Sequence, residues 1–296
     1  LDQGKVLGIV GESGSGKSVT AKSIMQLNPG NTIYNDNAEI IIDDENVLKF
    51  TSKNDLKKIR GGKVSMIFQE PMASFAPAIK IGNQMVEQLL LHKDLDKHKA
   101  KSISIDMLNR VGIADAEKRF NQYAFELSGG MRQRAMIAMA LSTMPKLLLA
   151  DEPTTALDVT IQAQVINLMK DIIKEFNMGV IFITHDLGVI AQVADDVAVM
   201  YLGSVVERGP VNEILKNPKH PYTKGLLNAL PDINNLDAPL KPIPGNIPSP
   251  LERPTGCVFR TRCPNPTHDC KEGNIEMGLI EVEPGHWVDQ CCVNCG

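Results

Sequence analysis

The chain has 296 residues, of which 43% are hydrophobic and 22% are charged, a composition typical of a globular protein with one large or two smaller domains. Its formal net charge of -4 argues against a protein that binds nucleic acid or an anionic membrane by overall charge. No apolar run reaches the length of about 18 residues that a membrane-spanning helix needs.

The chain begins LDQGKVLGIV, without an initiator Met or the zones of a signal peptide, so we expect a truncated start. Amphipathic stretches such as Thr160–Phe176 separate short apolar runs, and this alternation predicts a doubly wound α/β core. The runs indicate strands buried on both faces, as in a parallel sheet: Lys5–Val10, Lys63–Phe68, Lys146–Asp151, Gly179–Thr184 and Asp196–Tyr201.

No strand is indicated from about Pro71 to Phe125, where Ile81–Leu91 and Ala100–Ile113 have helical patterns. We therefore expect a helical subdomain, at about residues 71–127, inserted into the α/β core.

The composition changes near residue 217. Nine of the 18 prolines lie between Pro218 and Pro254, which predicts an extended, semi-rigid linker. We expect the α/β domain, with its helical subdomain, to span residues 1–216, followed by the linker and a cysteine region at 217–296. All the cysteines lie in that region, which indicates a cytosolic protein with one local cysteine site: Cys257, Cys263, Cys270, Cys291, Cys292 and Cys295.

The segment GIVGESGSGKSVT has the pattern G-x-x-x-x-G-K-S between a predicted strand and a predicted helix. Glycines let backbone N–H groups turn toward phosphate oxygens, and the helix N-terminus adds its positive dipole end. Lys17 is expected to reach the β- and γ-phosphates of ATP, and the Ser18 hydroxyl to ligate Mg²⁺. The alternative, a glycine-rich turn with a stray lysine, does not explain this setting. The predicted ATP-binding residues are Gly11, Glu12, Ser13, Gly14, Ser15, Gly16, Lys17, Ser18 and Val19.

Two adjacent acids, Asp151 and Glu152, end the apolar run KLLLADEP. Acids at the end of a buried strand are costly unless a cation or a reaction requires them. We expect Asp151 to hold Mg²⁺, directly or through water, and Glu152 to orient or deprotonate the attacking water. The alternative is an ordinary helix cap at a strand-to-helix turn.

Two further polar residues, Gln69 and His185, close predicted strands in VSMIFQ and GVIFITH. Ligands of doubly wound sheets bind beyond the carboxyl ends of the strands. Gln69 is therefore expected to reach Mg²⁺ or the attacking water, and His185 to hydrogen-bond the γ-phosphate. Each alone is more typical of a structural polar residue than of a functional one, but together with the phosphate loop the functional interpretation is favoured.

These residues resemble the nucleotide-binding subunit of an ABC transporter, a P-loop (RecA-like) ATPase. Five elements occur in the order of that family: GESGSGKS (Walker A), FQEP (Q-loop), LSGGMRQR (signature), LLLADEP with TALD (Walker B and D-loop) and ITHD (switch histidine). The resemblance extends from Leu1 to about Gly209. It implies a head-to-tail dimer in which Ser128, Gly129 and Gly130 bind the γ-phosphate of the partner's ATP. Bare glycine backbone at a helix N-terminus suits that contact.

Finer features resemble the oligopeptide/dipeptide importer ATPases, above all HPYTKGLLNALP and IPGNIPSP…GCVFRTRCPNPTHDC. The resemblance implies an ATP-hydrolysing subunit, peripheral on the cytoplasmic face of the membrane, that pairs with a homologous ATPase and with permease subunits. It also implies an indirect link to an extracytoplasmic substrate-binding protein. Nickel or glutathione remain alternative substrates. The segment Ser74–Ala78 departs from the subfamily pattern, and the aromatic residue that stacks on adenine is expected upstream of residue 1.

A nucleic-acid-linked ABC ATPase is the rival class. Such proteins carry long coiled coils between phosphate loop and signature, or two cassettes in tandem. Here only 57 residues separate Gln69 from Leu127, without a heptad pattern, and there is one cassette. We therefore expect no nucleic-acid partner.

The cysteines are spaced C-x5-C-x6-C, with CCVNC about 20 residues later. Cys257, Cys263 and Cys270, with one downstream cysteine, would suit a [4Fe-4S] cluster, most simply as a structural clamp. The subfamily's tail pattern makes Cys291 or Cys292 the fourth ligand. Zinc is the competitor, because a C-x-x-C pair also ends the chain, and unligated thiols are the third alternative.

Replacing Ser128 by arginine tests the composite site that the resemblance implies. The long arginine side chain would occupy the place of the γ-phosphate of the partner's ATP. Hydrolysis at the partner's Walker A is therefore expected to fall sharply, while ATP binding to the loop that contains Lys17 stays largely intact. ATPase and nucleotide-binding assays of the assembled dimer check this, and full activity at both sites would show that the composite interpretation is wrong.

Overall fold

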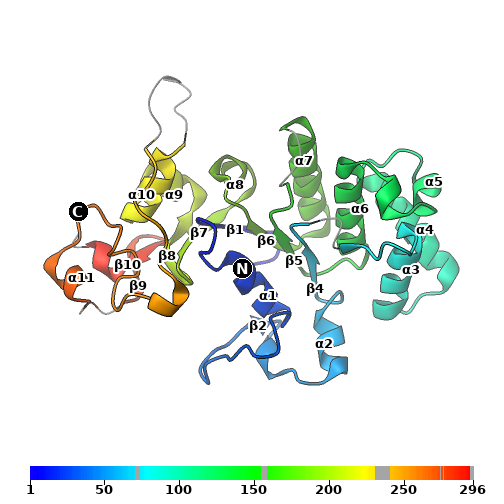
Figure 1. The fold of residues 1–296 in the computed structure, drawn as a ribbon. Helices are drawn as coiled ribbons and strands as arrows, with labels where there is room; N and C mark the ends of the chain where they lie inside the picture. Colours follow the sequence, from blue (N-terminus) through cyan, green and yellow to red (C-terminus); the bar gives the residue numbers. More distant parts are fainter. Residues whose placement is uncertain (71–73, 155–158, 231–240, 274, 276, 294–296) are drawn as a thin grey trace. The chain divides into compact units, whose positions relative to one another are not determined.

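The computed structural model describes residues 1–70, 74–154, 159–230, 241–273, 275 and 277–293 (Figure 1). The D-loop TALD, Cys295 and the proline-rich residues 231–240 lie outside the described residues. Contacts within the chain define two compact units, one of residues 1–5 and 18–181 and the other of residues 6–17 and 182–296. Among the described residues, no helix is both long and apolar enough to cross a membrane.

In the first unit, two buried strands run parallel, β4 (Val64–Ile67) and β5 (Leu147–Asp151). Their register pairs Val64 with Leu147 and Ile67 with Ala150, so the two carboxyl ends are level and the residues that follow them lie side by side. The other elements outside the helical part are α1 (Lys17–Ile24), the β2–β3 hairpin (Ile41–Ile42, Glu45–Asn46), α2 (Lys53–Ile59), α7 (Val159–Phe176) and β6 (Gly179–Ile183), which ends in the second unit.

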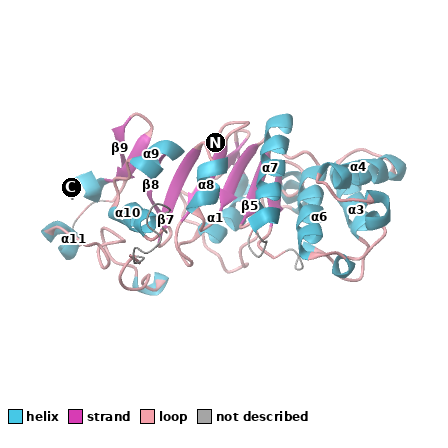
Figure 2. Ribbon diagram, turned by 90° about the horizontal axis from the view of Figure 1, so that it is seen from above, coloured by secondary structure: helices cyan, strands magenta, loops and turns pink. Residues whose placement is uncertain are grey.

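The predicted helical segment is confirmed, because the described residues 74–127 contain helices and no strand. The helix α3 packs against α4 and α6 (Figure 2), and it also packs against α5. The prediction that the second helix continues to Ile113 was wrong: it ends at Arg110, because Gly112 takes a left-handed φ of 73°. The bounds are α3 (Ile81–His92), α4 (Lys97–Arg110), α5 (Ala116–Phe120) and α6 (Gly129–Ser142).

In the second unit, the strand order is β1-β7-β8-β10-β9, with β1 parallel to β7 and each later pair antiparallel. The helix α8 packs against β1. The helix α9 packs against β8 (Figure 2). The bounds are β1 (Val6–Val10), α8 (Leu187–Val193), β7 (Asp196–Tyr201), β8 (Ser204–Pro210), α9 (Val211–Lys216), α10 (Pro221–Asn228), α11 (His268–Glu272), β9 (Leu279–Glu283) and β10 (His286–Asp289).

The five predicted strands are all present, and the α/β fold class is therefore confirmed. The prediction of an extended linker from residue 217 onward was wrong at its start, where α10 forms. Pro221 occupies the first turn of that helix, in which a missing N–H and a fixed φ are tolerated. Residues 241–249 contain no helix or strand, as the linker prediction requires.

An aromatic cluster joins the cysteine region to β7. The rings of Tyr201 and Phe259 lie 5.2 Å apart, and that of Tyr222 lies 4.8 Å from Tyr201 and 5.3 Å from Phe259. All three side chains are almost fully buried. Because edge-on aromatic contacts add to the burial of apolar area, this cluster anchors the C-terminal region on the sheet of its own unit.

Candidate ATP site

The phosphate loop, residues 11–16, connects β1 to α1, the setting that its sequence predicts. Ser15 accepts a hydrogen bond at its carbonyl from the N–H of Gly203, at 2.8 Å. A Cβ on Gly11 would lie 2.2 Å from the carbonyl oxygen of Met200, at the end of β7. The loop is therefore seated directly on β7, and only glycine permits that approach at position 11.

Lys17 is buried inside the loop, with 7% of its surface exposed. Its ammonium donates hydrogen bonds to the carbonyl oxygens of Gly11, at 2.8 Å, and Glu12, at 3.0 Å. These carbonyls fix the position of a positive charge at the centre of a loop of backbone N–H groups. Such an arrangement favours a polyphosphate ligand.

The Ser18 hydroxyl, on α1, donates a hydrogen bond to Oδ1 of Asp151, at 3.0 Å. Asp151 ends β5 and is 3% exposed. The sequence predicts both residues as Mg²⁺ ligands, and the structure brings their oxygens together. A hydroxyl and a carboxylate are hard oxygen donors of the kind that Mg²⁺ prefers, so this pair fits the metal.

Gln69 and Glu152 also lie side by side, because each follows one of the paired strands β4 and β5. The amide of Gln69 donates a hydrogen bond to Oε2 of Glu152, at 3.1 Å. Glu152 has a left-handed φ of 48°, a backbone state that costs a residue with a Cβ of the order of 1–2 kcal/mol. A strained acid at a strand end, aimed by an amide, is typical of a functional site.

The signature segment begins α6. Ser128 caps the helix, and its hydroxyl accepts a hydrogen bond from the N–H of Met131, at 3.4 Å. Ser128 and Gly129 are exposed, and no described atom outside the adjacent residues and the backbone of α6 lies within 4 Å of the place of a Cβ on Gly129. The helix N-terminus is thus open to a ligand. Met136, predicted to pack rather than bind, is buried, with 1% exposure.

His185 lies two residues after the end of β6 and is exposed. The next residue, Asp186, caps α8 by accepting hydrogen bonds from the N–H groups of Gly188 and Val189, at 2.8 and 3.2 Å. The cap fixes the turn that carries the imidazole.

The second unit adds two loop contacts that the sequence analysis missed. Tyr222, on α10, accepts a hydrogen bond from the N–H of Glu12, and Arg262 forms an ion pair with the Glu12 carboxylate. Tyr222 belongs to the stretch HPYTKGLLNALP and Arg262 to GCVFRTRC, so both were noticed only as part of a resemblance.

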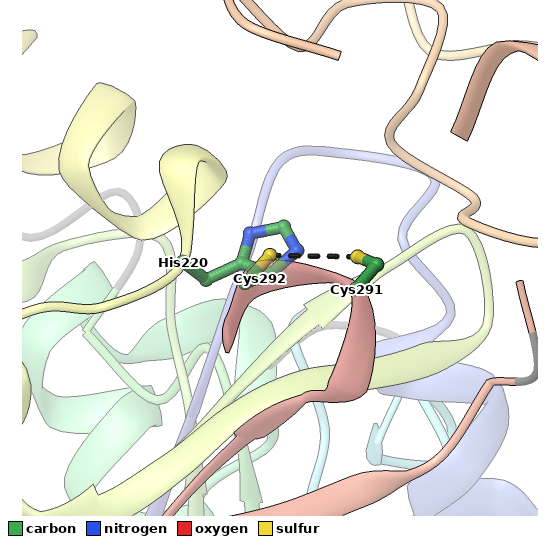
Figure 3. A group of neighbouring side chains, drawn as sticks. All are labelled: His220, Cys291 and Cys292. Atoms are coloured by element: carbon green, nitrogen blue, oxygen red, sulfur yellow. Dashed lines mark hydrogen bonds between the residues drawn. The ribbon is translucent and has the colours of Figure 1, made fainter. Parts of the chain in front are cut away.

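The cysteine region gathers its described thiols. The pKa of Cys257 is raised, first by a hydrogen bond with the Cys291 sulfur and then by burial. Burial also raises the pKa of Cys263, and its neighbours Cys257 and Cys270 raise it further. The sulfurs of Cys291 and Cys292 are 3.5 Å apart (Figure 3). Cys257 and Cys291, from two segments far apart in the sequence, are thus in contact, and Cys292 lies beside Cys291.

His220 lies beside these sulfurs, and the sequence analysis missed it. Its ligand atom and those of Cys291 and Cys292 are all within 4.8 Å of one another (Figure 3). Burial lowers the pKa of His220 to about 3, so the imidazole is neutral. Its Nε2 is buried and has no hydrogen-bond partner among the described residues.

A glycine-rich loop closed on a buried lysine, with a serine–aspartate pair and a strained glutamate at neighbouring strand ends, defines a P-loop nucleotide-hydrolysing protein. Comparison with known proteins defines the family. The family model described as "ABC transporter" matches residues 1–155, and that described as "Oligopeptide/dipeptide transporter, C-terminal region" matches residues 206–270. The chain belongs to the ABC transporter ATP-binding proteins, and it is an ATPase of that class.

Relatives support this membership over most of the chain. It is 49% identical to the oligopeptide transport ATP-binding protein AppD of Bacillus subtilis, a match that covers 91% of this chain and 82% of AppD. It is 46% identical to the dipeptide transport ATP-binding protein DppD of the same organism, over 100% of this chain and 86% of DppD.

Solved structures of ABC cassettes have the same fold. The dimeric ATP-binding cassette MJ0796, bound to ADP and Pi, superposes on this chain with a TM-score of 0.63 at 25% sequence identity. The match covers 71% of this chain and 87% of the MJ0796 chain. The chain cbiO1 of Clostridium perfringens superposes with a TM-score of 0.61 at 26% sequence identity. The match covers 73% of this chain and 80% of the cbiO1 chain.

Replacing Gly11 by alanine tests how closely the loop must approach β7. Gly11 and Gly14 both have positive φ, at 153° and 83°, but only at Gly11 would a Cβ meet the backbone of Met200. We expect Gly11→Ala to lower the free energy of unfolding by about 1–3 kcal/mol more than Gly14→Ala, the usual cost of overpacking. Chemical denaturation of the two variants checks this, and equal losses would contradict the close-approach argument.

Proposed function

We propose that the chain is the ATP-hydrolysing subunit of an importer of di- and oligopeptides. ATP joins it to a homologous ATPase subunit, and hydrolysis lets the two subunits part, which drives the permease subunits. The observation that carries the catalytic part is the Gln69–Glu152 contact at the ends of β4 and β5. The peptide substrate is supported by the match of residues 206–270 and by the relatives, rather than by any pocket for a peptide.

We assign the binding of ATP to the loop residues predicted from the sequence. Backbone N–H groups of residues 11–19 and the Lys17 ammonium bind the β- and γ-phosphates. Ser18, Asp151 and the Gln69 amide oxygen hold Mg²⁺, which neutralises charge on the phosphate oxygens when bound.

We assign the chemical step to Glu152. Its carboxylate accepts a proton from the attacking water, whose oxygen bonds to the γ-phosphorus as the bond from that phosphorus to the β–γ bridging oxygen breaks. The products are ADP and phosphate. His185 donates a hydrogen bond to the γ-phosphate, and Ser128, Gly129 and Gly130 bind the γ-phosphate of the partner's ATP through the open N-terminus of α6.

The assembly follows from the same proposal. The chain lies on the cytoplasmic face of the membrane, bound to permease subunits that receive peptide from an extracytoplasmic substrate-binding protein. Nickel or glutathione import is less well supported, because the relatives quoted above are named as oligopeptide and dipeptide transport proteins. The proposed domains are the ATPase domain at 1–216, with its helical subdomain at about 71–127, and the C-terminal region at 217–296.

We also propose that the cysteine region holds a [4Fe-4S] cluster through Cys257, Cys263, Cys270 and either Cys291 or Cys292. The donor set supports this, because Cys257, Cys270 and Cys291 are buried, Cys257 contacts Cys291, and the charges of Cys257 and Cys270 act on Cys263. Such a cluster would act as a clamp on the C-terminal region. Zinc is the competing metal, and the neutral His220 beside Cys291 and Cys292 suits zinc better than a four-cysteine cluster.

Replacing Glu152 by glutamine tests the catalytic assignment in the assembled transporter. The amide cannot accept the proton, so we expect turnover to fall by about 100-fold or more while ATP still binds, which traps the ATP-bound dimer. ATPase rates and size-exclusion chromatography with MgATP measure this. The control is Glu175→Gln, an exposed glutamate on α7, which is expected to leave turnover unchanged. Normal turnover in Glu152→Gln would refute the assigned role.

Iron and acid-labile sulfide analysis of anaerobically purified protein tests the metal proposal. We expect about four irons and four sulfides per chain, together with a brown colour that is lost in Cys257→Ser. Comparison of Cys291→Ser with Cys292→Ser identifies the fourth ligand. A colourless sample that contains zinc would exclude the cluster.

A further inference from the structure

Glu12, an acid inside the phosphate loop, is held by two residues of the C-terminal region. The guanidinium of Arg262 binds its carboxylate through both terminal nitrogens, Nη1 to Oε2 at 2.7 Å and Nη2 to Oε1 at 3.1 Å. The hydroxyl of Tyr222 accepts the backbone N–H of Glu12, at 2.8 Å. These contacts join positions that are 250 and 210 residues apart in the chain.

Arg262 is itself fixed in place. Its side chain is 3% exposed, and it donates further hydrogen bonds to the carbonyls of Pro244, at 2.8 Å, and Ile243, at 3.2 Å. Its guanidinium also lies over the ring of Tyr201, 5.8 Å from the centroid. In a bidentate ion pair, a rigid guanidinium fixes the position of the carboxylate that it binds.

Tyr222 is fixed by the start of α10. The buried carboxylate of Glu207, on β8, accepts the N–H groups of Lys219 and His220, at 2.6 and 3.1 Å. His220 then caps the helix by accepting the N–H of Tyr222, at 3.0 Å. Burial raises the pKa of Tyr222, so its hydroxyl stays neutral. Strand β8 thereby aims this hydroxyl at the loop.

The contacts on Glu12 bear on ATP in two ways. First, the carbonyl of Glu12 is one of the two backbone oxygens that hold the Lys17 ammonium, so the orientation of Glu12 affects that of Lys17. Second, a carboxylate within a phosphate-binding loop repels a polyphosphate unless a cation neutralises it. Arg262 supplies that cation.

We propose that Arg262 and Tyr222 are positioning residues for ATP binding, which hold Glu12 so that the phosphate loop keeps its shape and its favourable charge. The inference rests on the proposed assignment of this loop to ATP. It makes nucleotide binding depend on the C-terminal region, which contributes no residue to the ATP-binding set predicted from the sequence.

The test is MgATP affinity of the full chain, measured by titration calorimetry, with steady-state kinetics of the assembled transporter. Arg262→Gln keeps a hydrogen-bonding side chain but removes the charge. We expect the Kd and the KM for ATP to rise about tenfold, because one partner of a charge pair is left uncompensated, while kcat changes less than about twofold. Arg262→Lys keeps the positive charge but cannot form the two parallel hydrogen bonds to the carboxylate. Its Kd for MgATP is expected to lie between those of wild type and Arg262→Gln.

A second substitution distinguishes charge compensation from general damage. Glu12→Gln combined with Arg262→Gln removes the repulsive carboxylate, so the double variant should regain most of the lost affinity. A purely structural loss would not be recovered by a change on the loop. A double variant as weak as Arg262→Gln would overturn the charge part of the proposal.

Arg260→Ala is the matched control. Arg260 lies in the same segment, and within the described residues it donates hydrogen bonds to the carbonyls of Cys270 and Lys271, at 3.4 and 3.3 Å. The Kd of the Arg260→Ala variant for MgATP should therefore equal that of wild type. If it weakens binding as much as Arg262→Gln does, the effect belongs to the stability of the C-terminal region and the proposal is overturned.

Lys17→Ala distinguishes failure of the assignment of this loop to ATP from failure of the positioning proposal. If that variant binds MgATP like wild type, the assignment of the loop to ATP fails. If it loses binding but Arg262→Gln has a wild-type Kd, only the positioning proposal fails. Where Arg262→Gln does not fold, Tyr222→Phe replaces it: loss of one hydrogen bond is expected to raise the Kd about threefold, and an unchanged Kd overturns the proposal.

Discussion

The close approach of the phosphate loop to β7 is the constraint on which the arrangement of the second unit depends. The loop can enclose a buried ammonium only because its backbone lies against the end of β7, where a side chain at Gly11 would collide with the Met200 carbonyl. That seating also places Glu12 within reach of α10 and the cysteine region, which pack on the same strand through Tyr201. Phosphate binding and the anchoring of the C-terminal region therefore share one structural support.

The segment between Cys257 and Cys263 has two functions that are hard to separate. Phe259 anchors it in the aromatic cluster, and Arg262, one residue before Cys263, reaches Glu12. A metal that binds these cysteines would order the backbone that carries Arg262, since ligands of one ion are fixed relative to each other. The proposed clamp and the proposed positioning contact thus act on the same short piece of chain.

The sequence predicted those features that follow from local patterns. Buried parallel strands appear as continuous apolar runs, and level strand ends explain why Gln69 and Glu152 could be expected near one another. The strands β8, β9 and β10 were missed, since they form an antiparallel edge; β9 is only partly buried and lacks an apolar run. The contacts of Glu12 with Tyr222 and Arg262 were not predictable, because no local pattern fixes which distant side chains meet.

A last consequence concerns the two ATP sites of the proposed dimer. Gln133, buried on the signature helix α6, donates a side-chain hydrogen bond to the carbonyl of Pro153, the residue after Glu152. The N-terminus of α6 is assigned to the partner's ATP, whereas Glu152 is assigned to the ATP of its own chain. Because Glu152 has a left-handed φ of 48°, a shift of α6 on γ-phosphate binding would act beside a residue whose backbone is already strained. Under the proposed assignments, this hydrogen bond connects the helix that would bind the partner's ATP to the strand end that carries Glu152.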